Sequence, residues 1–230
     1  MILNNIKGAY FNNKNINSIW SNNQKIFPPI NNGNDSIPLG TPMEGGFFGG
    51  IMNPGQTGTH RYYLIVAPKA NGFHSGLRWK TVNTTTPGTN SLWDGWNNSN
   101  NMNNSTHPAA QWCRSRNING FNDWYLPAID EAEILFRAFR PHTAWNNVTN
   151  SGINNNSEPI GELYTINNPQ NTTLELFIPQ GSEEFTGGGY HVSTELNTSS
   201  AYIQNYNNGA RLNSWKFDTR PFRAVRRVFL

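Results

Sequence analysis

The chain is 230 residues long, which suits one large domain with at most a small appendage, and only 13% of its residues are charged. Its net charge of +3 comes without a continuous Lys/Arg stripe, its single cysteine excludes an internal disulfide, and no apolar run approaches the ~20 residues that span a bilayer. The 38 asparagines favour turns while the aromatic residues can form a core, so we expect a folded, loop-rich protein that neither binds nucleic acid nor inserts into a membrane.

The first 30 residues contain a short repeat, because residues 6–16 match residues 16–26 at a period of about ten. Each copy places apolar residues around an Asn-Asn pair, which can form a two-residue hairpin turn. Such a small sheet cannot bury its own face, so we expect residues 1–30 to be a β-hairpin segment for attachment or oligomerisation. A local hairpin packed on the main domain is the alternative. The candidate attachment residues are Tyr10, Phe11, Trp20 and Phe27.

Residues 31–43 are rich in Pro, Gly and Asn, which predicts a linker before a main domain at 44–230. The main domain opens with an apolar stretch at 45–51. The segment 61–68 has the β-branched and aromatic residues of a strand. Residues 69–106 mix scattered Trp and Gly with Asn and Thr, which predicts long loops with occasional strands.

Two helices are predicted in the middle of the chain. One covers residues 106–116, with Thr106 or His107 at its cap and Pro108 in its first turn. The other covers residues 129–139, where apolar residues recur at helical spacing, acidic residues open the helix and Pro141 ends it. Helices followed by strands indicate an α+β fold. The later strands are predicted at 162–166, 174–178, 190–193, 202–206, 216–217 and 223–229.

One segment and three shorter motifs occur in a fixed order. The segment Asp123-Trp124-Tyr125-Leu126-Pro127 is followed by Glu131, and the motifs lie at 107–113, 193–195 and 223–226. Together they resemble C-type-lectin-like domains, and more narrowly those similar to the C-terminal domain of the Lcl collagen-like adhesin, which occur in bacterial and phage proteins. The resemblance covers roughly the whole main domain and implies two helices, antiparallel sheets and long loops, with the last strand pairing beside the opening strands.

The resemblance gives structural rather than chemical roles to the residues that carry it. Tyr125 replaces the usual Arg of the segment, and Ala128 stands where a capping Ser or Thr is expected. The C-terminal arginines either bind phosphates or anionic glycans or, as we favour, pair with acids such as Glu131 or Glu195. The structural anchors are Trp124, Pro127, Glu131, Glu195, Arg223 and Arg226.

No motif in the chain predicts catalysis or a metal site. Glu158-Pro159-Ile160 matches the calcium-binding Glu-Pro-Asn triplet of lectins only in part, since Ile160 offers no ligand. Cys113 lies at an apolar helical position, where cysteines are mostly inert. Carboxylates at 130–133 and 183–184 could form a glycosidase pair only at a separation that a sequence does not show. We therefore expect no catalytic residue, no metal and no cofactor.

The segment 196–215 mixes flat aromatic side chains with amides, a composition that favours recognition of sugars or proteins. In the lectin-like phage adhesins that the chain resembles, this late region carries the receptor-binding face. Sheet packing is the alternative role for its tyrosines. The candidate receptor-binding residues are Tyr202, Gln204, Tyr206, Asn207, Asn208, Arg211, Asn213 and Trp215.

The resemblance implies a bacteriophage virion protein that is not an enzyme. We expect a host-attachment adhesin, at a tail fibre tip or spike, that binds a host cell-surface glycan or protein. Its N-terminal segment would bind other tail proteins, and the chain would form a homo-oligomer such as a homotrimer. No signal peptide is expected, because the first residues turn polar at once, so synthesis would be in the host cytoplasm. The alternatives are a structural virion component such as a head decoration or tail-connecting protein, a tail-borne glycan-processing enzyme, and a bacterial surface adhesin.

Overall fold

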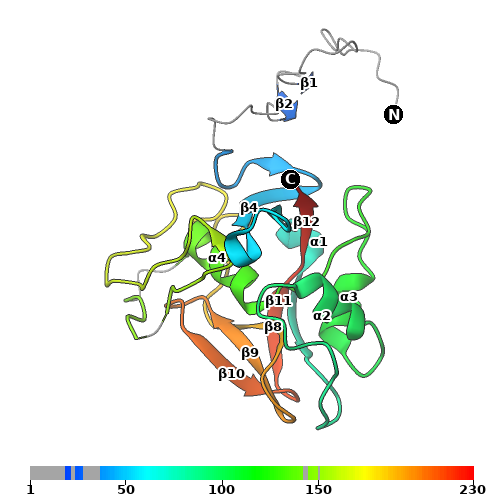
Figure 1. The fold of residues 1–230 in the computed structure, drawn as a ribbon. Coiled ribbons are helices and arrows are strands. Elements are labelled where there is room, and N and C mark those ends of the chain that lie inside the picture. The colour runs from blue at the N-terminus through cyan, green and yellow to red at the C-terminus, as the bar shows by residue number, and fades with distance from the viewer. Residues whose placement is uncertain (1–18, 22–23, 28–36, 142–144, 150) are drawn as a thin grey trace.

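The computed structural model describes residues 19–21, 24–27, 37–141, 145–149 and 151–230 and shows an α+β fold (Figure 1). This class is the one predicted, although the described residues form four α-helices where two were expected. The helices are α1 (Lys69–Gly72), α2 (Gly95–Asn101), α3 (Pro108–Arg114), α4 (Ile129–Phe139) and the 3-10 turn η1 (Pro54–Gln56). The strands are β1 (Ile19–Ser21), β2 (Gln24–Phe27), β3 (Pro42–Met43), β4 (Gly46–Met52), β5 (Tyr62–Val66), β6 (Phe73–Arg78), β7 (Ser157–Glu158), β8 (Gly189–Glu195), β9 (Ser200–Asn205), β10 (Arg211–Trp215), β11 (Thr219–Arg223) and β12 (Val225–Phe229).

The largest sheet brings together the beginning and the end of the main domain. Its strands run in the order β12, β5, β4, β3, and β7 pairs with β4. All of these pairs are antiparallel, and β12 lies along the whole of β5, from Val225 opposite Val66 to Phe229 opposite Tyr62. The predicted pairing of the last strand with the opening strands is therefore confirmed. Figure 1 shows β12 in red within this sheet.

β5 lies in the middle of the domain and is buried on both faces. Leu64 and Val66 belong to a core cluster that includes Phe136 of α4. Ile65 and Ala67 belong to a second cluster, on the opposite face, which includes the alanines of α3. Successive side chains of a strand point to opposite faces, so a strand covered on both sides needs a nearly continuous apolar run. The apolar run of this strand meets that requirement, which explains why it was the clearest strand signal.

α4 has the bounds that the sequence predicted, and its start is capped by distant residues. The Asp130 N–H donates to the Leu92 carbonyl at 2.9 Å, and the Ile129 N–H donates to Thr194 Oγ1 of β8 at 3.1 Å. These bonds satisfy two of the N–H groups that have no partner within a helix. Ala128 therefore needs no hydroxyl, because Thr194 takes over the role of the missing cap.

Two smaller sheets complete the domain. One has the order β10, β9, β8, and the other pairs β11 with β6. The strands predicted at 190–193, 202–206 and 223–229 correspond to β8, β9 and β12. The strands predicted at 162–166, 174–178 and 216–217 are wrong, since these segments form turns, isolated bridges and irregular backbone. The apolar residues of these segments do not belong to a continuous β-ladder.

α2 was not predicted, because it consists of Gly, Trp, Asn and Ser, which are poor helix formers. Its start is held by Asp94, whose Oδ1 accepts the Asn97 N–H at 3.0 Å. The buried Asn98 then donates to the Ser91 carbonyl at 2.8 Å. Side-chain bonds to the backbone and tertiary contacts thus override weak helix propensity here.

The N-terminal region is described only at β1 and β2. These strands form an antiparallel pair on either side of Asn22-Asn23, so the hairpin predicted for the second copy of the repeat is confirmed. Tyr10 and Phe11 lie outside the described residues, while Trp20 and Phe27 are strand residues of β1 and β2. The division into attachment segment, linker and main domain stays a prediction. No helix in the described part of the chain is long and apolar enough to cross a membrane.

Candidate functional site

The predicted receptor-binding residues lie on β9, β10 and the turn between them. Asn207, Asn213 and Trp215 are exposed, Trp215 to 61%. Arg211 is engaged within the domain, because its Nη2 lies 2.7 Å from Asp130 Oδ1. The half-buried members are Tyr202, Asn208 and Arg211. This hairpin therefore presents only part of the expected surface.

Gln204 and Tyr206 are not on the surface, which corrects the prediction for both residues. Gln204 lies opposite Tyr190 of β8, and its amide is fully buried with no hydrogen-bond partner among the described residues. Tyr206 stacks on Phe185 with ring centroids 4.5 Å apart, and its hydroxyl donates to the Ala132 carbonyl of α4 at 3.3 Å. α4 covers this face of the hairpin, so alternate residues of β9 face the helix instead of solvent. For Tyr206, the sheet-packing alternative is the correct one.

Glu131 is a fully buried junction between α4, β5 and the segment before α4. Its Oε1 accepts the hydroxyls of Tyr62 at 2.7 Å and Tyr125 at 2.6 Å, and its Oε2 accepts the Ala128 N–H at 2.7 Å. Burial raises the pKa of Glu131 to about 7, although these hydrogen bonds and the nearby Arg227 act to lower it. Tyr125 supplies a neutral donor to this carboxyl group.

Trp124 and Pro127 hold the same segment in place. Trp124 is fully buried, and its indole Nε1 donates to the Phe121 carbonyl at 3.0 Å. The Pro127 carbonyl accepts the Ser193 N–H of β8 at 2.7 Å. These contacts connect the segment before α4 to the sheet that carries the hairpin.

The C-terminal arginines are paired inside the domain. Arg223 donates to both the carbonyl and the carboxylate of Glu183. Arg226 forms ion pairs with Asp123 at 2.7 Å and with Glu44 at 3.0 Å. Pairing with acids, which we favoured, is therefore present, but the partners differ from the two acids that the sequence suggested. Carboxylates already neutralise these guanidinium groups, which argues against an anion site here.

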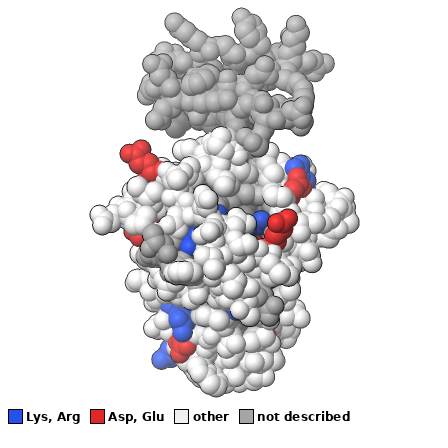
Figure 2. Space-filling model, turned by 90° about the vertical axis from the view of Figure 1, so that its left-hand side faces the viewer, with Lys and Arg blue, Asp and Glu red and all other residues white. Residues whose placement is uncertain are grey.

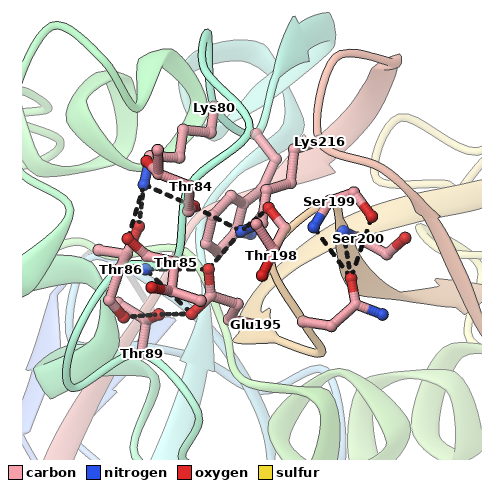
Figure 3. A network of polar contacts seen from close by, with 12 residues as sticks. Lys80, Thr84, Thr85, Thr86, Thr89, Glu195, Thr198, Ser199, Ser200 and Lys216 are labelled. Atoms are coloured by element: carbon pink, nitrogen blue, oxygen red, sulfur yellow. Dashed lines mark hydrogen bonds and ion pairs between the residues drawn. The ribbon is translucent and has the colours of Figure 1, made fainter.

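Figure 3 shows a buried polar network around Lys216 and Glu195. Lys216 is fully buried, and its Nζ donates to the carbonyls of Thr84 and Thr198, each at 2.9 Å, and to the Glu195 carboxylate. Glu195 also accepts the Thr86 N–H at 3.0 Å. Each ammonium proton has an acceptor, which is what a buried lysine requires. The network ties the loop before α2 to β8 and to the turn after β10.

Beside this network, Thr86, His107 and Asn104 align as a hydroxyl, an imidazole and an amide. Thr86 Oγ1 lies 2.9 Å from His107 Nε2, and His107 Nδ1 lies 2.8 Å from Asn104 Oδ1. Burial, with Lys80 and Lys216 nearby, lowers the pKa of His107 to about 4, so the ring is neutral near pH 7. Enzymes use this order of groups to activate a nucleophile. Here Thr86 is only 8% exposed and accepts from Lys80 Nζ at 2.7 Å, so its hydroxyl is closed to a substrate from solution.

A hollow of about 460 Å³ opens beside the end of α4 and the loops that follow it. We call it the Trp145 hollow, after the one aromatic residue of its described lining. Trp145 is 72% exposed and Ile166 is 49% exposed. The lining residues are Arg140, Trp145, Ile166, Asn167, Gln170 and Asn171. Apolar side chains left open to solvent beside a few converging polar groups are typical of a ligand site.

Hydrogen bonds to the loop backbone hold the walls of the Trp145 hollow. Asn146 Nδ2 donates to the carbonyls of Thr165 at 3.0 Å and Pro169 at 2.9 Å. Arg140, just after α4, donates to the same Pro169 carbonyl. Asn171 Oδ1 is buried and accepts no hydrogen bond from the described residues. The walls of the hollow are therefore held in shape by hydrogen bonds within the protein.

The loops around the Trp145 hollow lie on a side of the molecule with few charges. Figure 2 shows that Lys, Arg, Asp and Glu are sparse on this side. Among the described residues, the lining contains one ionisable side chain, Arg140, and no carboxylate, imidazole, hydroxyl or thiol. Acid–base and nucleophilic catalysis need such groups. The described lining therefore presents amides, an indole, an aliphatic side chain and a guanidinium.

Glu158, the first residue of the partial calcium triplet, is used within the protein. It pairs with Arg61 at 2.6 Å and accepts from Asn53 Nδ2 at 2.9 Å. Cys113 is fully buried, and burial raises the pKa of its thiol far above the usual range. Within the ranges that the structure describes, no group of three or more His, Cys, Asp and Glu side chains could hold a metal ion.

Sequence reasoning pointed to the β9–β10 hairpin and missed the Trp145 hollow. The one available signal was a tryptophan within polar residues that follow neither a helical nor a strand pattern. The lining comes from two stretches that meet only when the chain folds back after α4. Comparisons of the chain with family models, curated proteins and solved structures found no match.

Proposed function

We propose that this protein is a non-catalytic recognition protein whose Trp145 hollow binds one ring of a neutral glycan. The observation that carries the proposal is the indole of Trp145, 72% exposed at the edge of a hollow of about 460 Å³. A flat aromatic face can stack on the C–H face of a sugar ring, and it loses little conformational entropy on binding.

The polar part of the lining suits hydroxyl groups. Asn167, Gln170 and Asn171 provide amide donors and acceptors, and each amide can bond to neighbouring hydroxyls of a sugar. The guanidinium of Arg140 donates to the Pro169 carbonyl and holds the wall of the hollow, while the three amides of the lining are neutral and suit a neutral ring.

The lack of reactive groups in the described lining favours binding over glycan cleavage. Glycoside hydrolysis needs two carboxylates on either side of the scissile bond. The described lining has none. Among the candidate carboxylates at 130–133 and 183–184, Glu131 accepts from tyrosine hydroxyls and Glu183 pairs with an arginine.

The wider role we propose is attachment of a bacteriophage to its host, through a C-type-lectin-like domain at a tail fibre tip or spike. This part rests on the motif order in the sequence and on the α+β fold closed by β12. Several copies on one particle would let each glycan contact be weak, because multivalency raises the overall avidity.

The test compares two exposed tryptophans in the full chain. Binding to an array of neutral glycans is measured first, and titration calorimetry with the best ligand follows. Trp145→Ala should weaken the affinity at least about tenfold, as loss of a buried aromatic contact does. Trp215→Ala, which removes an indole exposed to 61% outside the hollow, should leave the affinity within about twofold.

Equal loss in both variants, or no retained neutral glycan, would contradict the Trp145 hollow as the site. Competition with virus for adsorption tests the wider role, since a purely structural virion component would not compete. Released reducing ends after incubation with host polysaccharide would instead support the glycan-processing alternative.

A further inference from the structure

β10 forms an open edge of the sheet β10–β9–β8. Figure 1 shows it on the outside of the domain, at the end opposite β4. An open edge exposes unpaired N–H and C=O groups and can pair with another strand, so proteins usually protect such edges with charges, proline or covering segments.

Three other strand edges, those of β8, β3 and β12, are protected. β8 is bonded by the Pro127 carbonyl, and β3 has only two residues and begins with Pro42. β12 carries two arginines and is bridged to Tyr125. β10 contains no proline or lysine, and its one charged residue, Arg211, is turned onto Asp130 of α4. β10 is therefore the least protected of these four edges.

The ladder with β9 determines which backbone groups of β10 point outward. The Asn205 N–H donates to the Ala210 carbonyl at 2.9 Å, at the start of this pair. Bonded and non-bonded pairs alternate along an antiparallel ladder. Leu212 and Ser214 therefore direct their backbone groups to β9, and the residues between and beside them direct theirs to the open edge. The residues with outward groups are Arg211, Asn213 and Trp215, of which the Trp215 carbonyl also accepts the Asp218 N–H of the following turn at 3.0 Å.

We propose that β10 is a self-association edge, which pairs antiparallel with β10 of a second copy of this chain about a two-fold axis at Asn213. This register places every outward-bonding residue opposite another one: Asn213 faces Asn213, and Arg211 faces Trp215. The side chains bring no like charges together, because Asp130 of its own chain pairs with Arg211 and the opposed Trp215 is uncharged. Leu212, exposed to 44%, lies opposite Ser214 and is partly covered by the second copy. A strand that complements itself fits a two-fold dimer better than an unrelated partner.

Disulfide trapping in the full chain tests the register. A directly opposed, hydrogen-bonded antiparallel pair has Cα atoms about 5.5 Å apart, which lies within the range that a disulfide spans. Asn213→Cys should therefore give a disulfide-linked dimer under mild oxidation. Leu212→Cys is the matched control, because the two copies of this residue are offset along the strands and should not be joined. Cys113, fully buried, does not compete.

Analytical sedimentation over a dilution series tests whether the dimer forms without an engineered disulfide. Asn213→Pro removes the outward N–H but leaves the ladder with β9, so it should weaken association at least about tenfold while the far-UV spectrum stays unchanged. Asn213→Ala keeps the N–H and should associate like the wild-type chain.

Equal crosslinking of the two cysteine variants would overturn the proposal, as would a wild-type chain that stays monomeric at high concentration. If Asn213→Pro does not fold, the trapping experiment alone decides. Glycan binding by the Trp145 hollow does not depend on β10, so the two proposals can fail separately.

Discussion

The β9–β10 hairpin and the loops around the Trp145 hollow are both rich in amides and both contain a tryptophan, yet they expose their side chains differently. Each combines a tryptophan with several amides. In the hairpin, strand alternation and the cover of α4 bury Gln204 and Tyr206. In the loops, no ladder imposes alternation, so Trp145 and its amide neighbours converge around a hollow. Composition marks both regions as candidate recognition surfaces, and backbone geometry decides which one is hollowed.

The largest effect should come from removing a hairpin aromatic residue that the domain buries. Tyr206→Ala should lower the free energy of unfolding by about 3–5 kcal/mol, because it empties a site packed between Phe185 and α4. Urea unfolding measures the change. A loss below 1 kcal/mol would mean that Tyr206 is not a core residue and that the hairpin surface was misjudged.

The next largest effect is the pH dependence of stability, which should involve the buried Glu131 of α4 and not the Trp145 hollow. Burial raises the pKa of Glu131 to about 7 from an ordinary value of 4.5, so the folded protein holds this proton more tightly than the unfolded chain. Below pH 4.5 the raised pKa of Glu131 contributes its whole stabilisation to the free energy of unfolding. As the pH rises from 4.5 to 7, this contribution of roughly 3 kcal/mol is lost.

The free energy of unfolding is measured between pH 4.5 and 8 for the wild-type chain and for Glu131→Gln. The difference between the two proteins isolates Glu131, because the histidines affect the pH dependence of both equally. Glycan affinity of the Trp145 hollow should stay nearly constant over the same range, because the one ionisable residue of its described lining is Arg140. A difference in stability that rises with pH would show that the pKa of Glu131 is lowered by its hydrogen bonds.

A smaller effect, of opposite sign, is expected at Gln204. Its amide is fully buried without a partner among the described residues. Gln204→Met keeps the length of the side chain and removes the unpaired polar atoms, so it should raise the free energy of unfolding by about 1 kcal/mol. Thermal unfolding provides the measurement. A destabilised variant would reveal a bound water or another partner of this amide.

The smallest effect on stability is expected at Trp145. Because the side chain is 72% exposed, Trp145→Ala should change the free energy of unfolding by less than about 0.5 kcal/mol while it weakens glycan binding at least about tenfold. The same urea titration used for Tyr206→Ala checks this value. A large loss of stability would mean that the indole supports the loops, and the binding result would then need another explanation.

The sequence predicted those elements whose pattern is local. α4 shows helical spacing of its apolar residues with acids at its start, and β5 is an apolar run of the right length. The cap that Thr194 supplies to α4 was invisible, because the two segments are far apart in the chain. The face of β9 that α4 covers was equally invisible, which is why Gln204 was placed on the surface.

The loops after α4 were misread as strands because single apolar residues such as Tyr164 looked like strand residues. In the structure, Tyr164 donates to the buried Glu133 at 2.7 Å, and Asn146 and Asn154 bond to backbone carbonyls. Such side-chain bonds hold irregular backbone without producing any periodic pattern. The Trp145 hollow is built from this kind of backbone, so no pattern could predict it.

The pairing of β12 with β5 has a consequence for biosynthesis. β5 is made early and needs β12 on one side, but β12 emerges from the ribosome only after almost all of the domain has been translated. Until then an apolar strand lacks its neighbour, and its unpaired edge favours aggregation. We therefore expect a chain cut short before Val225 to aggregate or be degraded instead of reaching the folded state.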